Sequence, residues 1–132
     1  MELEFKIFEH TAALIGRTPW EVSRDAELLF GAHAAAYRLY QHTPIIPAID
    51  HYNLVPEAYG ATVVQPNGNG VPAIHNPMMK TVSSLLNLRS FNPSQDGRIP
   101  MILDVATRLA RQFPEAKVAV PVDGPFSIAS AM

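Results

Sequence analysis

The chain has 132 residues, of which 48% are hydrophobic and 17% charged, and its formal net charge is −2. This composition excludes a disordered chain, and the weak negative charge argues against nucleic acid as a partner. Cysteine is absent, which excludes disulfides and thiolate metal ligands. No apolar run approaches about 20 residues, the length that spans a bilayer. We therefore expect one cytoplasmic domain with one core and no membrane contact.

The first third of the chain predicts two helices. Residues 3–15 place their apolar side chains on one helical face, and Gly16 is a suitable C-terminal stop. Residues 26–41 carry a second apolar stripe, and Asp25 is a suitable N-cap for them. Together they form a helical lead-in over residues 1–43.

The next segment predicts a strand and a short helix. Residues 45–49 are apolar on both faces, which is typical of a buried parallel strand. Pro44 and Pro47 weaken this interpretation, because proline cannot donate to a strand ladder. A short helix over 53–59 is expected to end at Gly60.

The middle of the chain predicts a β-hairpin. In residues 61–75 the pairs Asn67-Gly68 and Asn69-Gly70 provide the positive φ angles that a tight hairpin turn needs. Residues 80–88 are weakly helical, and a loop follows them. 

The last third predicts the clearest helix and a second strand. Asp96 is a suitable N-cap for apolar residues that keep the helical period up to Phe113, and Pro114 ends the helix. Residues 117–122 predict another buried strand, followed by a turn and the start of a helix.

Two buried strands that are joined through helices predict a right-handed parallel crossover. Two strands alone leave unpaired edges and an uncovered face. We therefore expect self-association, or a partner chain that covers the edges. A complete small α/β domain that hides its edges by oligomerising is the alternative to a piece of a larger fold.

Two segments resemble the uroporphyrinogen decarboxylase superfamily, namely IIPAIDHYNLVPEAYGATV and QDGRIPMILDVATRLARQFPEAKVAVPVDGPFSIASAM. That superfamily contains porphyrinogen decarboxylases and corrinoid- or cobalamin-dependent methyltransferases. The resemblance implies an α/β fold class, a TIM-type (β/α)8 barrel, and such barrels take about 250 residues. Residues 1–132 would then be an N-terminal segment, in which 44–132 hold the first two parallel strands, the inserted β-hairpin and the crossover helices. We expect a truncated, engineered or split piece of such a barrel.

The candidate catalytic residues follow the first strand. Reactive groups of TIM barrels lie at the carboxyl ends of the strands, where Asp50 and Asp123 stand. In a decarboxylase the resemblance implies that Asp50 accepts pyrrole N–H bonds, and in a methyltransferase that it lines the cavity. Helix capping is the alternative role of both acids. His51 is a candidate proton donor near neutral pH.

Further candidates are expected to bind substrate or cofactor. Tyr52 can stack on a ring, Asn53 lies on the same loop, and His75 can fold over the pocket. The second strand contributes a tight turn and a flat aromatic face, from Asp123, Gly124, Pro125 and Phe126. A plain βα turn is the alternative role of this second group.

The expected activity follows the methyltransferase branch. In the decarboxylases of the superfamily that this chain resembles, an N-terminal arginine-rich segment binds the carboxylates of the substrate. The nearest segment here, LIGRTPWEV, has Arg17 and is followed only by Arg24, so the paired-arginine motif is not present. We expect the N-terminal portion of an enzyme that uses cobalamin or another corrinoid and binds a small-molecule or tetrapyrrole ligand. The resemblance to the methyltransferases also implies a zinc ion in a full-length enzyme, but the ligands of that zinc are not in this chain. A uroporphyrinogen decarboxylase of porphyrin biosynthesis and a non-catalytic assembly subunit are the alternatives.

Overall fold

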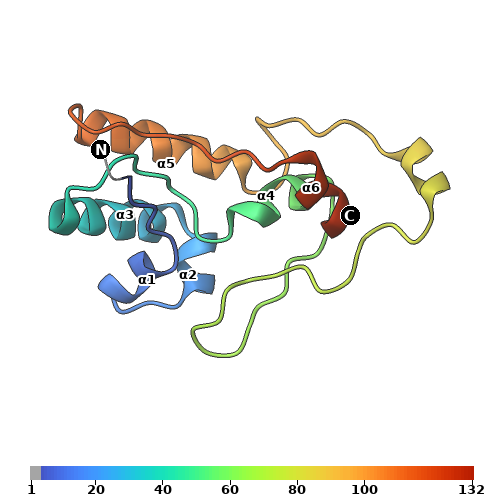
Figure 1. Ribbon diagram of the computed structural model, residues 1–132, viewed down its shortest axis with the longest axis horizontal. Coiled ribbons are helices and arrows are strands. Elements are labelled where there is room, and N and C mark those ends of the chain that lie inside the picture. The colour runs from blue at the N-terminus through green and yellow to red at the C-terminus, as the bar shows by residue number, and fades with distance from the viewer. Residues whose placement is uncertain (1–3) are drawn as a thin grey trace.

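The computed structural model describes residues 4–132, and its ordered elements are helical (Figure 1). The elements are α1 (His10–Leu14), α2 (Pro19–Arg24), α3 (Ala26–Tyr40), α4 (Leu54–Ala58), α5 (Ile99–Gln112), α6 (Pro125–Ala131) and the 3-10 helices η1 (His51–Asn53) and η2 (Val82–Asn87). None of the helices within residues 4–132 has the length and apolar character needed to cross a bilayer.

The core lies between α3 and α5, with α1 and α2 packed on α3 (Figure 1). Both long helices were predicted, and their apolar stripes form this core, which includes Leu29, Val105 and Leu109. The Asp25 side chain accepts hydrogen bonds from the backbone N–H groups of Glu27 and Leu28, which confirms it as the N-cap of α3. 

The predicted α/β fold class is wrong, because residues 4–132 form no strand. Segments 45–49 and 117–122 lie side by side but meet only at one isolated parallel bridge, between Ile45 and Val118. The Ile45 amide donates to the Lys117 carbonyl at 2.8 Å, and the Ala119 amide donates to the Ile45 carbonyl at 3.0 Å. Pro44, Pro47 and Pro121 have no N–H group, so the ladder cannot extend into two parallel strands.

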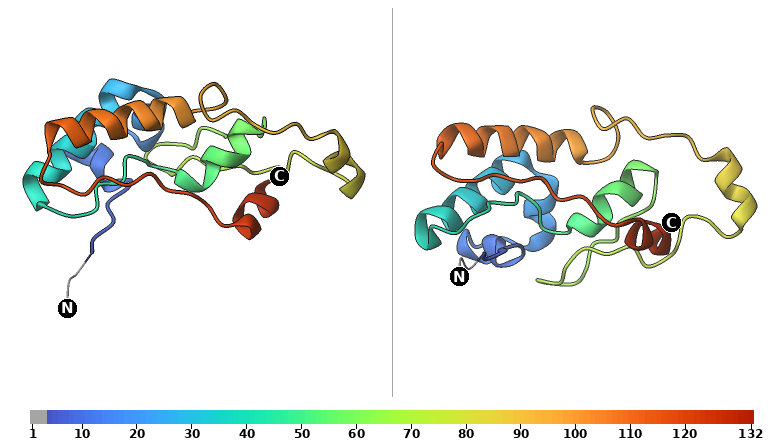
Figure 2. Two further views of the ribbon diagram at one scale, coloured as in Figure 1. Left: turned by 90° about the horizontal axis from the view of Figure 1, so that it is seen from above. Right: turned by 45° about the horizontal axis from the view of Figure 1, so that its top comes forward.

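The predicted β-hairpin is not formed either. Residues 61–75 contain a single antiparallel bridge, in which the Val64 amide donates to the Ala73 carbonyl at 2.9 Å. Pro66 and Pro72 interrupt the pairing on both sides because they lack donors. Residues 60–98 instead form a long excursion from the helices, with η2 at its outer end (Figure 2).

Three helix predictions also need correction. Only His10–Leu14 of the expected helix 3–15 is helical, and residue 3 lies outside the described residues. Helix α2 was not predicted, although the capping box between Thr18 and Glu21 is a sequence signal for its N-terminus. Asp96 does not cap α5, because its carboxylate binds Arg89 and the Asn92 amide instead.

Candidate functional site

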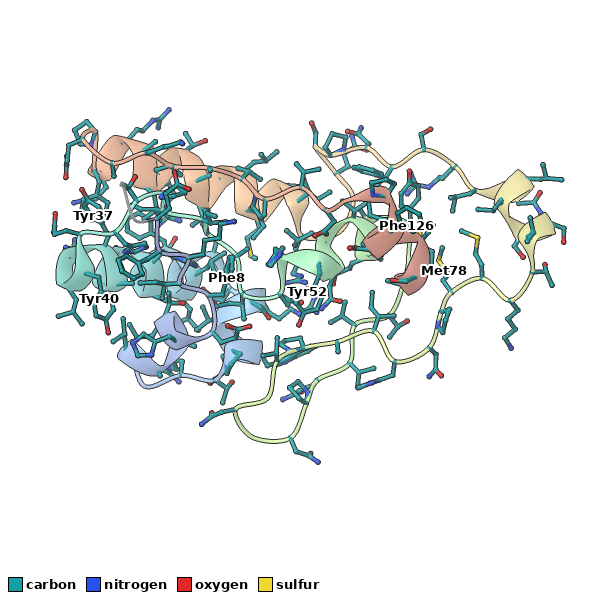
Figure 3. The ribbon with its side chains drawn as sticks, viewed as in Figure 1. Phe8, Tyr37, Tyr40, Tyr52, Met78 and Phe126 are labelled. Carbon is teal, nitrogen blue, oxygen red and sulfur yellow. The ribbon has the colours of Figure 1, made fainter. Side chains whose placement is uncertain are left out.

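The two groups of predicted site residues come together. Asp50–Asn53 lie at η1, Asp123–Phe126 lie at the start of α6, and α6 packs against η1 (Figure 3). His75 is exposed on the 60–98 excursion, and no hydrogen bond, ion pair or ring contact among residues 4–132 joins it to the others. The structure therefore gathers every predicted site residue except His75 around one junction.

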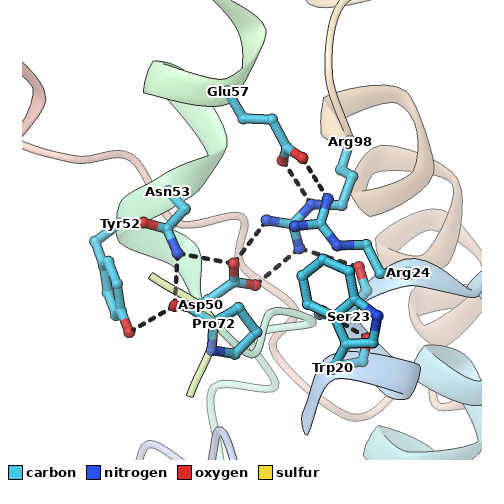
Figure 4. A network of polar contacts seen from close by, with 9 residues as sticks. All are labelled: Trp20, Ser23, Arg24, Asp50, Tyr52, Asn53, Glu57, Pro72 and Arg98. Atoms are coloured by element: carbon cyan, nitrogen blue, oxygen red, sulfur yellow. Dashed lines mark hydrogen bonds and ion pairs between the residues drawn. The ribbon is translucent and has the colours of Figure 1, made fainter. Parts of the chain in front are cut away.

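Asp50 lies at the centre of a buried polar network (Figure 4). Its side chain is 1% exposed, and Arg98 donates to both carboxylate oxygens in a fork, at 2.8 Å and 2.7 Å. The Asn53 amide donates to Oδ2 at 2.9 Å. The carboxylate is thus fully paired within the protein, so a ligand reaches it only if the Arg98 side chain moves.

Arg98 joins four parts of the chain. Besides the Asp50 fork, its Nε donates to Glu57 of α4 at 2.6 Å and its Nη1 donates to the Ser23 carbonyl of α2 at 3.0 Å. Burial alone would lower the pKa of Arg98, but Asp50 and Glu57 outweigh it and raise the pKa above its ordinary value. A buried arginine with two carboxylates and a carbonyl fixes α2, η1, α4 and the start of α5 relative to one another.

Arg24 adds a second guanidinium to the network. It pairs with the other oxygen of Glu57 and stacks on Trp20, with its Cζ 4.4 Å from the ring centroid (Figure 4). The two arginines and the two acids balance in charge, which is what burial of ionised groups requires. 

The backbone beside Arg98 explains how it reaches this position. Gly97 has φ +59°, and a Cβ there would stand 3.0 Å from the Ala58 backbone nitrogen. Only glycine fits both the left-handed conformation and this close approach to α4. The network members Arg98, Glu57 and Trp20 were not predicted as site residues. A glycine-arginine pair directly before an apolar helix is the signal that marks Arg98.

Aromatic rings surround His51 at the edge of the network. Phe8 stacks on its ring at 4.8 Å, and Tyr52 meets it edge-on at 5.5 Å. The Nδ1 atom of His51 is buried without a hydrogen-bond partner among residues 4–132. The Tyr52 hydroxyl donates to the Pro72 carbonyl at 3.4 Å, and the Asn53 amide donates to the same oxygen at 2.8 Å.

Electrostatics link His51 to the acid at the start of α6. Burial raises the pKa of Asp123, and the neighbouring His51 partly offsets that rise. Burial also raises the pKa of the Tyr52 hydroxyl, with further contributions from Asp50 and Glu9. The Asp123 carboxyl and the Tyr52 hydroxyl therefore both keep their protons to a higher pH than they would in water. This arrangement can hold or move a proton at the junction.

An open groove lies beside α6. It has a volume of about 700 Å3 and is bounded by α4, residues 77–91 and α6, with Pro125 among its lining residues. Its other lining residues are mostly apolar: Val55, Tyr59, Pro77, Met79, Lys80, Thr81, Val82, Leu85, Leu88, Phe91, Val122, Ile128, Ala129, Ser130 and Met132. We call this feature the α4–α6 groove.

Residues 4–132 do not provide a zinc site, but they do provide apolar surface of the kind that a corrinoid needs. Zinc bound by cysteine does not fit this chain, which has no cysteine, and residues 4–132 contain no cluster of three or more His, Cys, Asp or Glu. A corrinoid needs flat apolar contact surface. Phe126 is 91% exposed and Tyr52 36% exposed at the η1–α6 junction, and they provide such surface.

Comparison with known proteins gives one match. A model of the uroporphyrinogen decarboxylase (URO-D) family matches residues 7–132. No curated protein and no solved structure matches the chain. The family match covers nearly the whole chain, and the chain therefore belongs to the uroporphyrinogen decarboxylase family.

Proposed function

We propose that this chain contributes the N-terminal portion of a methyl-transfer enzyme of this family. The whole enzyme moves a methyl group between a methylated donor, a corrinoid and a thiol or similar acceptor. The chain alone is incomplete for catalysis, because its exposed apolar side chains call for further protein and it lacks the cysteines of a thiol-activating metal site. The proposed setting is the cytoplasm, where thiols stay reduced.

The ion pairs that the arginines form are the observation that supports this proposal. A porphyrinogen decarboxylase binds several substrate carboxylates, and free guanidinium forks suit that task. Near the junction, however, Arg98 pairs with Asp50 and Glu57, and Arg24 pairs with Glu57. Arg17 lies 3.4 Å from Glu21. Arg98 uses all its guanidinium nitrogens on internal partners, whereas Arg24 has no hydrogen-bond partner for Nε and Nη2 among residues 4–132. The fully paired state of Arg98 is therefore the observation that favours a ligand with fewer carboxylates.

The junction residues have distinct proposed roles. A corrinoid, when bound, carries the methyl group, and Tyr52 and Phe126 offer the aromatic surface that holds its ring. His51 is the proposed proton donor, because its Nδ1 has no hydrogen-bond partner among residues 4–132 and Asp123 lies within electrostatic reach. Asp50 is the second proposed catalytic residue, held by Arg98 and Asn53 until the site takes up its ligand.

Titration of cobalamin with the full-length protein, followed by visible absorbance, tests the proposal. We expect a saturable spectral change that weakens at least tenfold in Phe126→Ala and Tyr52→Ala. Tyr40→Ala is the matched control, because Tyr40 is also exposed but lies on α3 and bonds His10. Absence of any spectral change, or an equal loss in the Tyr40 variant, would contradict the proposal.

The decarboxylase alternative rests on Asp50 and its neighbour His51. A carboxylate beside a proton donor is the pair that stabilises and then protonates a decarboxylated pyrrole. Uroporphyrinogen turnover by the full-length protein, lost in Asp50→Asn, would establish this activity and displace methyl transfer. 

The non-catalytic alternative is an assembly subunit. Val82, Leu86 and Phe126 are 82%, 89% and 91% exposed, and such side chains suit an interface with another chain. A stable complex with a second chain that neither binds cobalamin nor turns over uroporphyrinogen would favour this role.

A further inference from the structure

We propose that Asn67 is a site of spontaneous chemical modification, at which the folded protein converts asparagine to aspartate and isoaspartate faster than at any other asparagine. Asn67-Gly68 and Asn69-Gly70, the two pairs from which a hairpin turn was predicted, stand in an irregular, exposed loop. This inference depends on that loop alone and requires neither a corrinoid nor methyl transfer.

The reaction needs an asparagine side chain and the backbone nitrogen of the next residue. That nitrogen attacks the side-chain amide carbon, Cγ, and a new N–C bond closes a succinimide ring. The C–N bond of the side-chain amide breaks, and the leaving group takes up the backbone N–H proton and departs as ammonia. Water then opens the ring at either carbonyl carbon, which gives aspartate or isoaspartate. The chain and water supply every reactant.

The residue that follows each asparagine decides which of them can react. Two of the six asparagines precede proline, which has no N–H group and cannot close the ring. Two others precede leucine, whose side chain obstructs the attack. Asn67 and Asn69 are the two that precede glycine, where no Cβ stands in the way.

The structure distinguishes these two candidates by the nitrogen that would attack. Both asparagines are exposed, so water reaches both side-chain amides. The Gly70 amide, which would attack Asn69, donates to the Asn67 carbonyl at 3.4 Å. The Gly68 amide, which would attack Asn67, has no hydrogen-bond partner among residues 4–132. Attack on Asn69 therefore breaks a hydrogen bond that attack on Asn67 does not.

The packing of the two glycines differs in the same direction. A Cβ at Gly70 would stand 2.8 Å from the Pro66 Cβ, so the backbone of Gly70 lies tightly against the proline. Around Gly68, which has φ +60°, an added Cβ would meet no atom within 4 Å. Gly68 thus has the space and the backbone freedom to move its nitrogen toward Cγ of Asn67.

The base of the loop is tied to the rest of the protein. The Val64 amide donates to the Ala73 carbonyl at 2.9 Å, and the Asn53 side chain donates to the Pro72 carbonyl at 2.8 Å. The reaction at Asn67 adds one negative charge beyond these contacts and, in the isoaspartate product, one methylene group to the backbone. We expect the modified protein to keep its fold, because residues 66–70 carry none of these bonds.

Incubation of the protein in mildly alkaline buffer tests the proposal. Peptide mapping by mass spectrometry locates the mass increase that accompanies replacement of NH2 by OH, and chromatography separates the aspartate and isoaspartate peptides. We expect product at Asn67 to form about fivefold faster than at Asn69, the factor that corresponds to one weak hydrogen bond. In the chain unfolded by urea the two rates should become equal, because both asparagines precede glycine.

Two matched variants check the assignment in the intact protein. Asn67→Gln should remove most of the product, since glutamine would have to close a larger ring. Asn69→Gln is the control, because it makes the same change two residues away, and it should leave the product at Asn67 unchanged.

Three results would overturn the proposal: no product at Asn67 in the folded protein, equal rates at Asn67 and Asn69 before unfolding, or a faster reaction at Asn69. A ratio of rates that is the same in urea would show that the fold does not select the site, and would overturn it as well. Cobalamin plays no part in these readouts, so their failure is distinct from failure of the proposed function.

Discussion

Arg98 is the residue whose contacts reach the largest number of separate segments at the site. Its guanidinium is 9% exposed and bonds Asp50, Glu57 and the Ser23 carbonyl. Such a buried cluster adds little stability compared with apolar residues of the same shape, but it is costly to break in half. Its role is to fix geometry, and its removal leaves two acids buried beside a single arginine.

Arg98→Met should therefore lower the free energy of unfolding by about 3–5 kcal/mol, because Asp50 loses its only cation. Arg98→Lys should fall between Met and the wild type, since lysine keeps the charge but not the fork. Urea denaturation measures both. Arg89→Met is the control, because Arg89 forms a comparable fork with Asp96 but is 70% exposed. It should cost at most about 1 kcal/mol, and equal losses at the two sites would contradict the interpretation.

His33 and His42 form a second buried polar pair, away from the site. They are 0% and 4% exposed, and none of their ring nitrogens has a hydrogen-bond partner among residues 4–132. Burial lowers the pKa of His33 from 6.5 to about 3, and His42 adds repulsion. Burial also lowers the pKa of His42. Both imidazoles are therefore neutral in the folded protein.

The sign of the pH dependence follows from these lowered pKa values. The unfolded chain binds protons below pH 6.5 that the folded protein rejects until about pH 3, so stability is full above pH 6.5 and falls with acid. His33 alone contributes about 1.4 kcal/mol per pH unit. Urea denaturation between pH 6.5 and pH 4.5 should show this slope, in a window where most carboxylates stay ionised.

His33→Leu should lower this slope by about 1.4 kcal/mol per pH unit, the contribution of one proton taken up on unfolding. His10→Gln, at an exposed histidine, should leave the slope unchanged. A slope that is identical in the wild type and His33→Leu would show that the buried pair does not control acid stability.

At the scale of elements, the helix ends show where local signals decide the structure. Asp25 is the C-cap residue of α2 and the N-cap residue of α3. Its carboxylate accepts hydrogen bonds from two backbone N–H groups, at 2.8 Å and 2.9 Å. Asp25→Ala should cost about 1 kcal/mol in thermal or urea unfolding. Glu9→Ala is the control, because Glu9 is the N-cap residue of α1 but forms no side-chain cap bond. A similar loss in both variants would refute the assignment of Asp25 as a cap.

The sequence predicted these elements unequally, for physical reasons. Helices α3 and α5 carry long apolar stripes that bury against each other, so their period alone identifies them. Segments 45–49 and 117–122 have the apolar character of strands, but a strand needs a ladder, and prolines remove its donors. Composition cannot distinguish a buried extended segment from a buried strand, and for this reason the prediction of a sheet from segments 45–49 and 117–122 was wrong.

The site shows the same division. Asp50 and Asp123 were expected at one pocket mouth because two neighbouring parallel strands would end there. Those strands do not form, but α6 packs against η1 and brings the two groups of residues together. The Arg98 fork joins residues 48 positions apart in the sequence, and no local pattern shows which arginine pairs with which acid. Long-range pairing of charges depends on the packed fold, so these partners became visible only in the structure.

At the scale of the whole molecule, the two ends differ in how well they are covered. Helices α3 and α5 form one end, and α6 with the 60–98 excursion forms the other (Figure 1). The α3–α5 end holds the core, whereas the other end carries the most exposed apolar side chains, Val82, Leu86, Val122 and Phe126. Exposed apolar patches of this kind mark protein–protein contacts. We expect this end to mediate contact with further protein, either a second copy or another part of the enzyme.

Sedimentation velocity over a range of concentrations tests this expectation. The protein should self-associate, and Leu86→Asp with Phe126→Asp should shift it to the monomer, because each places a charge where an apolar side chain is about 90% exposed. Leu39→Asp is the matched control, since Leu39 is 61% exposed on α3 at the covered end, and it should leave association unchanged. A wild type that is monomeric at every concentration, or an equal effect of the Leu39 variant, would show that these apolar side chains remain in water and that the uncovered end is not a contact surface between copies of the chain.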